Sequence, residues 1–315
     1  MATTPVARIK AVTAATPASQ GEDVKSVLKA LILLPLRLAD AYSRAVARLW
    51  PSAGFAWTDL AYGITRDSRV TVRHSTSAGS LDMTFYTPNE MCRYRTDTFS
   101  TKEPETLEWI DRFGGNGALY DIGANVGLYS VYYAKVHGGT VYAFEPSVLN
   151  LGLLAKNISI NDLSDRVVIV PNPLTSQNQV APFHLSMLDE GGSMSTFGIE
   201  TGHDGASLQT QLAYGTTGMS LDFMVEQGLI PQPPTMIKID VDGIEHLILR
   251  GAEKVLALPC LQTVLIEVNE DFQVLATEVE DLLRSAGLAL VERRHSDMFA
   301  GGAFENTYNQ IWVRD

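Results

Sequence analysis

The sequence predicts an α/β protein with one mostly parallel sheet that is covered by helices on both faces. From residue 118 onward, short apolar runs alternate with longer segments of helical periodicity, and this alternation is typical of a parallel sheet. A buried-strand pattern ends at Asp121 and breaks at once into a turn at Gly123, before a further helical segment. A strand, a tight loop and a helix in this order form the unit that binds nucleotide-like ligands in α/β sheets.

The first 100 residues are expected to form an N-terminal extension. Residues 1–23 are predicted to be a disordered leader rich in Ala, Thr, Pro and Ser, with a cleavable organellar presequence as the less favoured alternative. Residues 24–50 have the pattern of a basic amphipathic helix that Pro35 kinks or splits. We expect it to pack on the domain or on a dimer mate, and docking on a membrane surface is the weaker alternative. Its apolar run, residues 30–36, is shorter than the about 20 residues that span a bilayer.

The remaining elements follow from periodicity and turn signals. Residues 68–85 alternate as in a β-hairpin, and residues 102–113 are predicted to be a helix. We then expect strands at 118–122, 140–145, 167–170, 236–240, 263–268, 288–293 and 308–313, and helices at 127–136, 147–160, 219–228, 244–258 and 277–286. The last two strands have no helix between them, so they must pair antiparallel. Residues 189–218 form a polar, glycine-rich excursion, which is either a lid or binding loop or a disordered insertion.

The composition is typical of one catalytic domain, residues 101–315, in a reducing compartment. With 315 residues and 45% hydrophobic content, the chain can bury one large core. Its 24 basic and 36 acidic residues give a net charge of −12, which disfavours a nucleic-acid substrate and favours a small-molecule acceptor. Cys92 and Cys260 form neither a disulfide framework nor a metal motif. We therefore expect a cytoplasmic protein.

The glycine turn differs from a dinucleotide-binding loop. Gly123 and Gly127 suit a tight turn and a close helix, but Asn125 stands where the middle glycine of the dinucleotide fingerprint is wanted for contact with a pyrophosphate. Asp121 at the mouth of the loop would repel a pyrophosphate and attract an ammonium group. Asn125 is predicted either to contact the ligand or to hold the turn, and Asp121 either to bind the ligand or to cap its own loop.

A second acid follows the next strand. Glu145 and Pro146 end that strand, where a carboxylate can accept both hydroxyls of a ribose. An adenosine that carries a positive charge fits both Asp121 and Glu145, so S-adenosylmethionine is the expected cofactor. Asn172 lies in a turn after the third strand and is either an adenine contact or a turn residue.

Four segments together carry a family resemblance: YDIGANVG, VYAFEPSVLNLGLLAKNISIN, MIKIDVDGIEHLILRGAEKVL and VLIEVNE. In this order they resemble the FkbM family of S-adenosylmethionine-dependent methyltransferases, from about Thr101 to the C-terminus. The resemblance implies the class I methyltransferase fold, a seven-stranded sheet with an antiparallel hairpin at one edge. It also implies O-methylation of hydroxyls, often on sugars or polyketide-type products. The chain has Asp242-Gly243-Ile244-Glu245 where the family usually has Glu-Gly-Ala-Glu, which keeps both charges.

Within these motifs, three residues are candidates for the chemistry. Asp240 ends a central strand and could hold the methionine portion of the cofactor, orient the acceptor or act as a base. His246 could titrate as a base at neutral pH, although a helical surface histidine is the commoner explanation. Glu267 ends the neighbouring strand and is either a group on the acceptor side or a satisfied core acid.

Further polar residues of the same motifs are predicted to contact the acceptor. These are Asp242, Glu245 and Asn269, although Glu245 could instead complement the dipole of its own helix. Lys238 is expected to form an ion pair with a structural role. Acids so close together could bind Mg²⁺, but a cationic cofactor does not require a metal, and none is predicted.

The sequence therefore predicts an O-methyltransferase that acts on a small molecule, either a sugar or a glycosylated or polyketide-type metabolite. The alternatives are an N-methyltransferase, a Rossmann-type NAD oxidoreductase and a non-catalytic module that binds S-adenosylmethionine. The missing middle glycine disfavours the oxidoreductase, and a homodimer is left open.

Overall fold

The computed structural model describes residues 18–77, 79–202, 204–295, 298, 301–302 and 304–314. Contacts divide the chain into two compact units, one that ends at Ile64 and one that begins at Thr65. Residues 1–17 of the predicted leader lie outside the described residues. Residues 18–23 of that leader are helical, because the first helix begins at Ala18.

The described part of the first unit, residues 18–64, is formed by two helices. Helix α1 (Ala18–Leu49) continues through Pro35, so the predicted helix is present and is not split there. Helix α2 (Pro51–Arg66) begins with a proline, which suits the first helical position because its missing N–H would have no partner there. The sequence pattern had not indicated this second helix. No helix within the described part of the chain combines the length and the apolarity that a membrane crossing needs.

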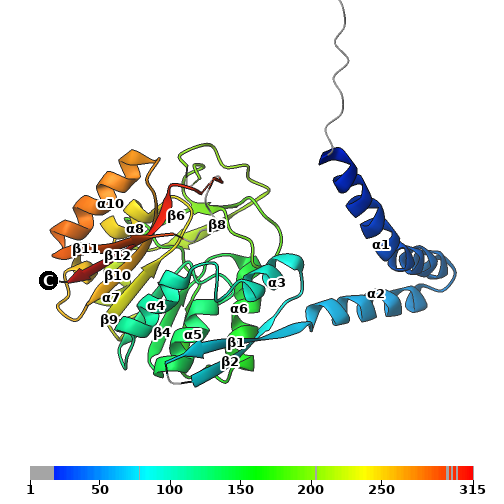
Figure 1. Cartoon of the computed structure of the whole chain (residues 1–315), viewed down its shortest axis with the longest axis horizontal. Coiled ribbons are helices and arrows are strands. Elements are labelled where there is room, and N and C mark those ends of the chain that lie inside the picture. Colours follow the sequence, from blue (N-terminus) through cyan, green and yellow to red (C-terminus); the bar gives the residue numbers. More distant parts are fainter. Residues whose placement is uncertain are drawn as a thin grey trace, which may run out of the picture. The chain divides into compact units, whose positions relative to one another are not determined.

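The second unit is built on a seven-stranded sheet (Figure 1). Its strand order is β11 (Leu288–Arg294), β12 (Thr307–Arg314), β10 (Thr263–Asn269), β9 (Pro234–Ile239), β3 (Ala118–Ile122), β4 (Thr140–Phe144) and β5 (Val167–Val170). The strands from β10 to β5 are parallel, and β12 runs antiparallel to both of its neighbours. The predicted α/β class and the antiparallel pair at the C-terminus are confirmed.

Helices cover both faces of this sheet because successive strand residues point to opposite sides. On one face, Tyr120 and Ile239 pack in a core with α7 (Leu221–Glu226), α8 (Glu245–Arg250), α9 (Glu253–Leu256) and α10 (Gln273–Ser285). On the other face, Leu119 and Leu265 pack with α4 (Pro104–Phe113), α5 (Leu128–His137) and α6 (Val148–Ile160).

The helix predicted at 244–258 is instead two helices, α8 and α9, with an interruption at Gly251. A side chain at Gly251 would place its Cβ 2.2 Å from the carbonyl oxygen of Thr175. The chain therefore lies close to a neighbouring backbone at Gly251. The hydrophobic pattern of the sequence cannot predict such a contact.

The predicted hairpin forms from β1 (Arg69–Thr76) and β2 (Gly79–Tyr86), which pair antiparallel. It packs within the second unit, because side chains of α6 bond to the β2 backbone. The N–H of Tyr86 donates to Asn157 Oδ1 at 2.9 Å, and the N–H of Thr84 donates to Asn161 Oδ1 at 3.0 Å. A short helix that the sequence did not indicate, α3 (Glu90–Asp97), follows the hairpin, with Asn89 as its N-cap.

The polar excursion contains two strands, although its sequence shows no strand periodicity. Strands β7 (Ser195–Phe197) and β8 (Leu212–Gly218) pair antiparallel with the two sides of β6 (Gln179–Leu185) in a separate three-stranded sheet. Their partner β6 lies outside the excursion, which is why the segment gave no strand signal of its own. We call residues 189–195, which lead into β7, the strap.

Candidate active site

A pocket of about 330 Å³ lies at the carboxyl ends of the central strands. The strand register explains why four of the predicted residues meet there. Phe144, Ile122, Ile239 and Ile266 are partners across four adjacent parallel strands. The next residue on each of those strands is, in the same order, Glu145, Gly123, Asp240 and Glu267, and all four line the pocket.

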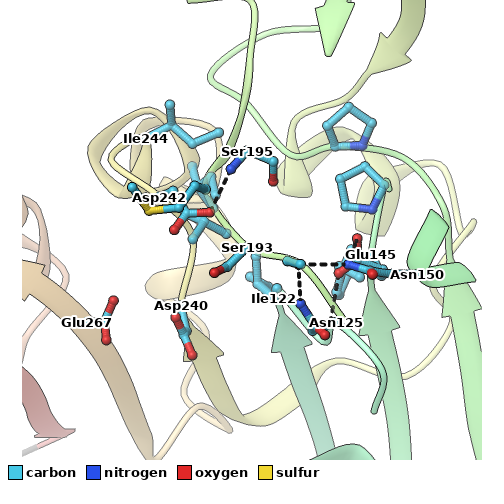
Figure 2. A pocket seen from close by; sticks show the side chains of 18 of the residues that line it. Ile122, Asn125, Glu145, Asn150, Ser193, Ser195, Asp240, Asp242, Ile244 and Glu267 are labelled. Carbon is cyan, nitrogen blue, oxygen red and sulfur yellow. Dashed lines mark hydrogen bonds between the residues drawn. The ribbon is translucent and has the colours of Figure 1, made fainter. Parts of the chain in front are cut away.

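Eight of the predicted site residues line this pocket, and five do not. Those that line it are Gly123, Asn125, Glu145, Pro146, Asn172, Asp240, Asp242 and Glu267. Those outside its lining are Asp121, Gly127, Glu245, His246 and Asn269. Figure 2 shows Asp240 and Glu267 on one side of the space, Glu145, Asn150 and Asn125 on the other side, and Ser193 between them.

Two glycines shape the loop after β3. Gly123 has φ +86°, and a Cβ there would lie 1.9 Å from the carbonyl oxygen of Asp240, so only glycine fits. Gly127 has φ +87° and caps α5, and a Cβ there would lie 2.5 Å from Leu154 Cδ1. Gly127 therefore allows the loop to pack closely against α6, and it does not line the pocket. Asn125 has φ +53°, a conformation that asparagine tolerates better than most residues.

Glu145 is buried and held by N–H donors. Its Oε2 accepts from the backbone N–H of Asn125 at 2.7 Å, and its Oε1 accepts from the N–H of Ser147 at 2.8 Å and from Asn150 Nδ2 at 3.4 Å. Burial raises the pKa of Glu145 to about 7, although these donors favour the charged form. A carboxylate has about four acceptor sites, so room remains for a ligand hydroxyl at the pocket side.

Asp240 is paired with a buried lysine, as the sequence suggested. Lys238 is 1% exposed, and its Nζ donates to Asp240 Oδ2 at 2.7 Å. Burial would raise the pKa of Asp240, but the charges of Lys238 and Lys102 outweigh it, and the pKa is lowered. Asp240 is therefore an anion at neutral pH, with part of its side chain open to the pocket.

Glu267 has the opposite electrostatic environment. Burial raises its pKa well above the ordinary value for a glutamate, and the negative charges of Asp240 and Glu103 add to this effect. Two carboxyls of one pocket thus have pKa values displaced in opposite directions. Such a pair is typical of acid and base roles in a catalytic site.

Asp121 lies on β3 two residues before Gly123, one of the four residues that line the pocket at the ends of the parallel strands. It is 1% exposed and accepts a hydrogen bond from Ser130 Oγ on α5 at 2.6 Å, while its Oδ1 has no hydrogen-bond partner. Burial raises its pKa, and the charge of Lys238, its register neighbour on β9, opposes that rise. The contact of Asp121 with a cofactor ammonium stays a prediction.

Two further predicted residues, Glu245 and Asn269, have local partners outside the pocket. Glu245 begins α8, its Oε1 accepts from the N–H of Gly243 at 3.2 Å, and burial raises its pKa to about 8. Asn269 Oδ1 accepts from the N–H of Asp271 at 3.0 Å, which is a turn contact at the end of β10.

His246 does not reach the pocket, so the structure does not support it as the base. It was singled out for its closeness to Asp240 in the sequence, but each helical residue turns by about 100° from the last. Partial burial lowers its pKa, and the nearby charges that act on it are those of Glu278 on α10 and of Arg250.

The strap belongs to the excursion that was expected to be either a lid or binding loop or a disordered insertion, and it forms a wall of the pocket. The carbonyl oxygen of Gly192 accepts from Asn125 Nδ2 at 2.8 Å and from Asn150 Nδ2 at 3.3 Å. The N–H of Gly191 donates to Asn150 Oδ1 at 2.8 Å, and the carbonyl of Gly191 accepts from Arg95 Nε at 2.7 Å. Asn150, 4% exposed, thus links the strap to Glu145. A polar residue on the first turn of a largely apolar helix was its only signal in the sequence.

The far end of the strap is tied to the motif after β9. The N–H of Ser195 donates to Asp242 Oδ2 at 2.8 Å. The near end is tied to α3, where Asn89 Nδ2 donates to the carbonyl of Glu190 at 3.0 Å. Asp242 therefore lines the pocket and also anchors its wall. Within the described residues, no group of three or more His, Cys, Asp or Glu side chains is arranged to hold a metal ion.

Comparison with solved structures finds several methyltransferases. The chain is similar to the crystal structure of methyltransferase FkbM from Methylobacillus flagellatus KT, at 13% identity over 71% of this chain and 52% of that chain, with a TM-score of 0.46. It spans about half the length of that protein. Precorrin-6y C5,15-methyltransferase from Geobacter metallireducens GS-15 matches at 14% identity over 68% and 86%, with a TM-score of 0.38. A putative rRNA-methylase from Clostridium thermocellum matches at 11% identity over 68% and 98%, with a TM-score of 0.41.

The family comparison is more specific. No curated protein matches the chain, but the methyltransferase FkbM domain matches residues 121–288, which are 168 of the 315 residues. The matched span runs from the last part of β3 to the first residue of β11 and contains the row of residues that lines the pocket. The chain therefore belongs to the FkbM family of methyltransferases.

Proposed function

We propose that the protein transfers a methyl group from S-adenosylmethionine to a hydroxyl of a small molecule, and that a sugar or a glycosylated or polyketide-type metabolite is the acceptor. The observation that carries this proposal is the pocket row of Glu145, Gly123, Asp240 and Glu267 on four parallel strands. In this row, the Glu145 carboxylate would bind the ribose of S-adenosylmethionine, and the Asp240 carboxylate would bind its positively charged end. S-adenosylmethionine would supply an activated methyl group on a cationic sulfur.

On the cofactor side, the residues at the ends of β3 and β4 would bind S-adenosylmethionine and orient it. Glu145 would accept hydrogen bonds from the ribose hydroxyls, and the closely packed Gly123 leaves the space in front of the loop open. Asp240 stays charged beside Lys238 and would attract the cationic end of the cofactor, because Lys238 occupies only its Oδ2. Asn172 also lines the pocket, and its Nδ2 donates to the carbonyl of Thr217 at 3.0 Å. This bond stabilises the turn from which Asn172 would contact the edge of the adenine.

On the acceptor side, Glu267 would take the proton from the hydroxyl. Its raised pKa makes it a stronger base than Asp240 once it has lost its own proton. The strap, which is bonded to Asn125, Asn150 and Asp242, would help to exclude water from the pocket as a whole. Activity should therefore rise with pH as Glu267 deprotonates.

The first test is calorimetric titration of the full chain with S-adenosylmethionine and with its demethylated product, using NAD as a control. We expect both methionine derivatives to bind and NAD not to bind. Glu145→Gln should weaken binding about tenfold to a hundredfold, the usual effect of losing a hydrogen bond to a charged group. Glu226→Gln, on an exposed helix end, is the matched control and should bind as the parent does.

The affinity should also depend on pH through Glu145. Its pKa of about 7 means that the carboxylate form gains population between pH 6 and pH 8, so the gap in affinity between the parent and Glu145→Gln should widen over that range. If neither S-adenosylmethionine nor its demethylated product binds, the proposal is overturned. Binding of NAD alone would favour an oxidoreductase.

The base is tested by Glu267→Gln. This variant should keep its affinity for S-adenosylmethionine and should lose most turnover in a screen of hydroxylated acceptors that follows release of the demethylated product. Turnover on amines but not on hydroxyls would replace O-methylation with N-methylation.

A further inference from the structure

Helix α1 exposes an unusual number of large apolar side chains. Leu31, Leu38, Tyr42 and Leu49 are between 60% and 91% exposed, and they recur at intervals of seven, four and seven residues. Such spacing places them on one side of the helix. Trp50, directly after α1, and Leu60, Tyr62 and Ile64 on α2 are also exposed. Soluble monomers rarely leave so continuous an apolar face in water, so this face has a partner.

The charge of this segment is opposite in sign to that of the protein. From Lys25 to Arg48 there are five basic residues and one acidic residue, a net charge of +4, in a chain whose total is −12. The single acid, Asp40, is already paired with Arg44 at 2.8 Å. Two further acids of α1, Glu22 and Asp23, precede this stretch at the start of the helix.

The basic side chains gather on a different side of α1 from the apolar ones. Arg37, Arg44 and Arg48 fall within about 40° of one another around the helix axis and roughly 120° from the centre of the apolar side. All three are exposed. An apolar side next to a basic side, with aromatic rings at the end of the helix, is the arrangement of helices that lie in the surface of a membrane.

We propose that α1 docks the protein on an anionic lipid surface, with its apolar side in the interface and its arginines over the headgroups. Charge complementarity selects this partner over a second copy of the helix. In a symmetric pair of α1 helices, each net +4 segment would face another, whereas each arginine beside an anionic membrane gains about 1 kcal/mol. Pro35, at a position of the same apolar side, would also interrupt close pairing of two helices.

The docking residues belong to the first unit and the pocket residues to the second, so separate measurements test the two proposals. The test is sedimentation of the full chain with vesicles of neutral phosphatidylcholine and with vesicles that contain 30% phosphatidylserine. Binding is expected on the anionic vesicles, at least tenfold stronger than on the neutral ones, and it should weaken in high salt.

Two pairs of substitutions separate the charged and the apolar contributions. Arg37→Ser with Arg48→Ser should lower the partition constant roughly 30-fold, whereas Arg166→Ser, an exposed arginine of the second unit, should leave it unchanged. Leu31→Ser with Leu38→Ser should abolish binding. Val180→Ser, which changes an exposed apolar residue of the second unit, should leave binding unchanged.

Absence of binding to anionic vesicles, or equal binding to both kinds, would overturn the proposal. So would a concentration-dependent dimer in sedimentation velocity that Leu31→Ser with Leu38→Ser dissociates, since the apolar side would then be covered by a second copy. Calorimetry with S-adenosylmethionine on the same variants reports on the pocket separately, and its result should match that of the parent.

Discussion

Lys238→Met removes a buried cation whose charge acts on both Asp121 and Asp240, without changing the size of the side chain greatly. Lys238 and Asp121 are each 1% exposed, and Asp240 keeps 30% of its side chain exposed. Removing one member of a buried ion pair usually costs about 3–5 kcal/mol. Because Asp240 is partly exposed and still has Lys102 nearby, we expect the low end, about 3 kcal/mol of the free energy of unfolding.

Urea unfolding of the parent and the variant measures this loss, and its pH dependence identifies the cause. The folded pKa of Asp240 is lowered, so its ion pair contributes stability above the ordinary aspartate pKa and loses it as the pH falls through the folded pKa. The variant lacks that contribution at every pH. The two proteins should therefore differ most near pH 7 and converge as the pH is lowered toward 3.

The matched control is Lys254→Met, which removes an exposed lysine that pairs with Glu226. Surface pairs of this kind contribute about 0–1 kcal/mol, so this variant should unfold almost as the parent does. A loss below about 1 kcal/mol for Lys238→Met, or a loss that does not shrink as the pH falls below the ordinary aspartate pKa, would refute the account of Asp240 as an anion stabilised by its lysine.

Three further predictions concern packing and burial. Gly123→Ala should abolish binding of S-adenosylmethionine in calorimetry, because the new Cβ would lie 1.9 Å from a backbone oxygen, whereas Gly152→Ala, with open space around it on α6, should bind normally. Glu245→Gln should match the parent near pH 5 and exceed it in urea unfolding at pH 9 by about 1 kcal/mol or more, since the folded pKa of about 8 makes the parent lose stability as the pH rises. Trp109→Phe should lower the free energy of unfolding by about 1–3 kcal/mol, because its indole N–H donates to Thr263 Oγ1 at 2.9 Å in the core; an unchanged midpoint would contradict this.

The sheet was predictable because its central strands are buried on both faces, so each is a nearly continuous apolar run that ends at a turn signal. The same logic predicted most of the pocket. In a parallel sheet the residues that follow the strands meet at one edge, so Glu145, Asp240 and Glu267 could be brought together from the sequence alone.

The errors have physical causes that a one-dimensional pattern cannot contain. His246 is close to Asp240 in the chain, but α8 carries it away from the pocket. Asp121 lies two residues before Gly123 and accepts a hydrogen bond from Ser130 on α5, so its contact with a cofactor stays a prediction. Strand β8 takes its shape from pairing with β6, more than 25 residues earlier, and its own sequence of small and polar residues is typical of a loop.

The strap is held to the pocket through its own main chain. Its carbonyl oxygens and N–H groups meet side chains that belong to other elements, at both ends and in the middle. Apart from Gly191 and Gly192, where a Cβ would lie 2.9 Å from Cys92 Sγ and from the carbonyl oxygen of Asp189, this attachment uses no side chain of the strap itself. Ser193 and Met194, which line the pocket, are therefore free to be exchanged while the wall stays in place. Under the proposed function, we therefore expect point mutations at Ser193 to change the acceptor while the wall of the pocket and the stability of the chain are kept.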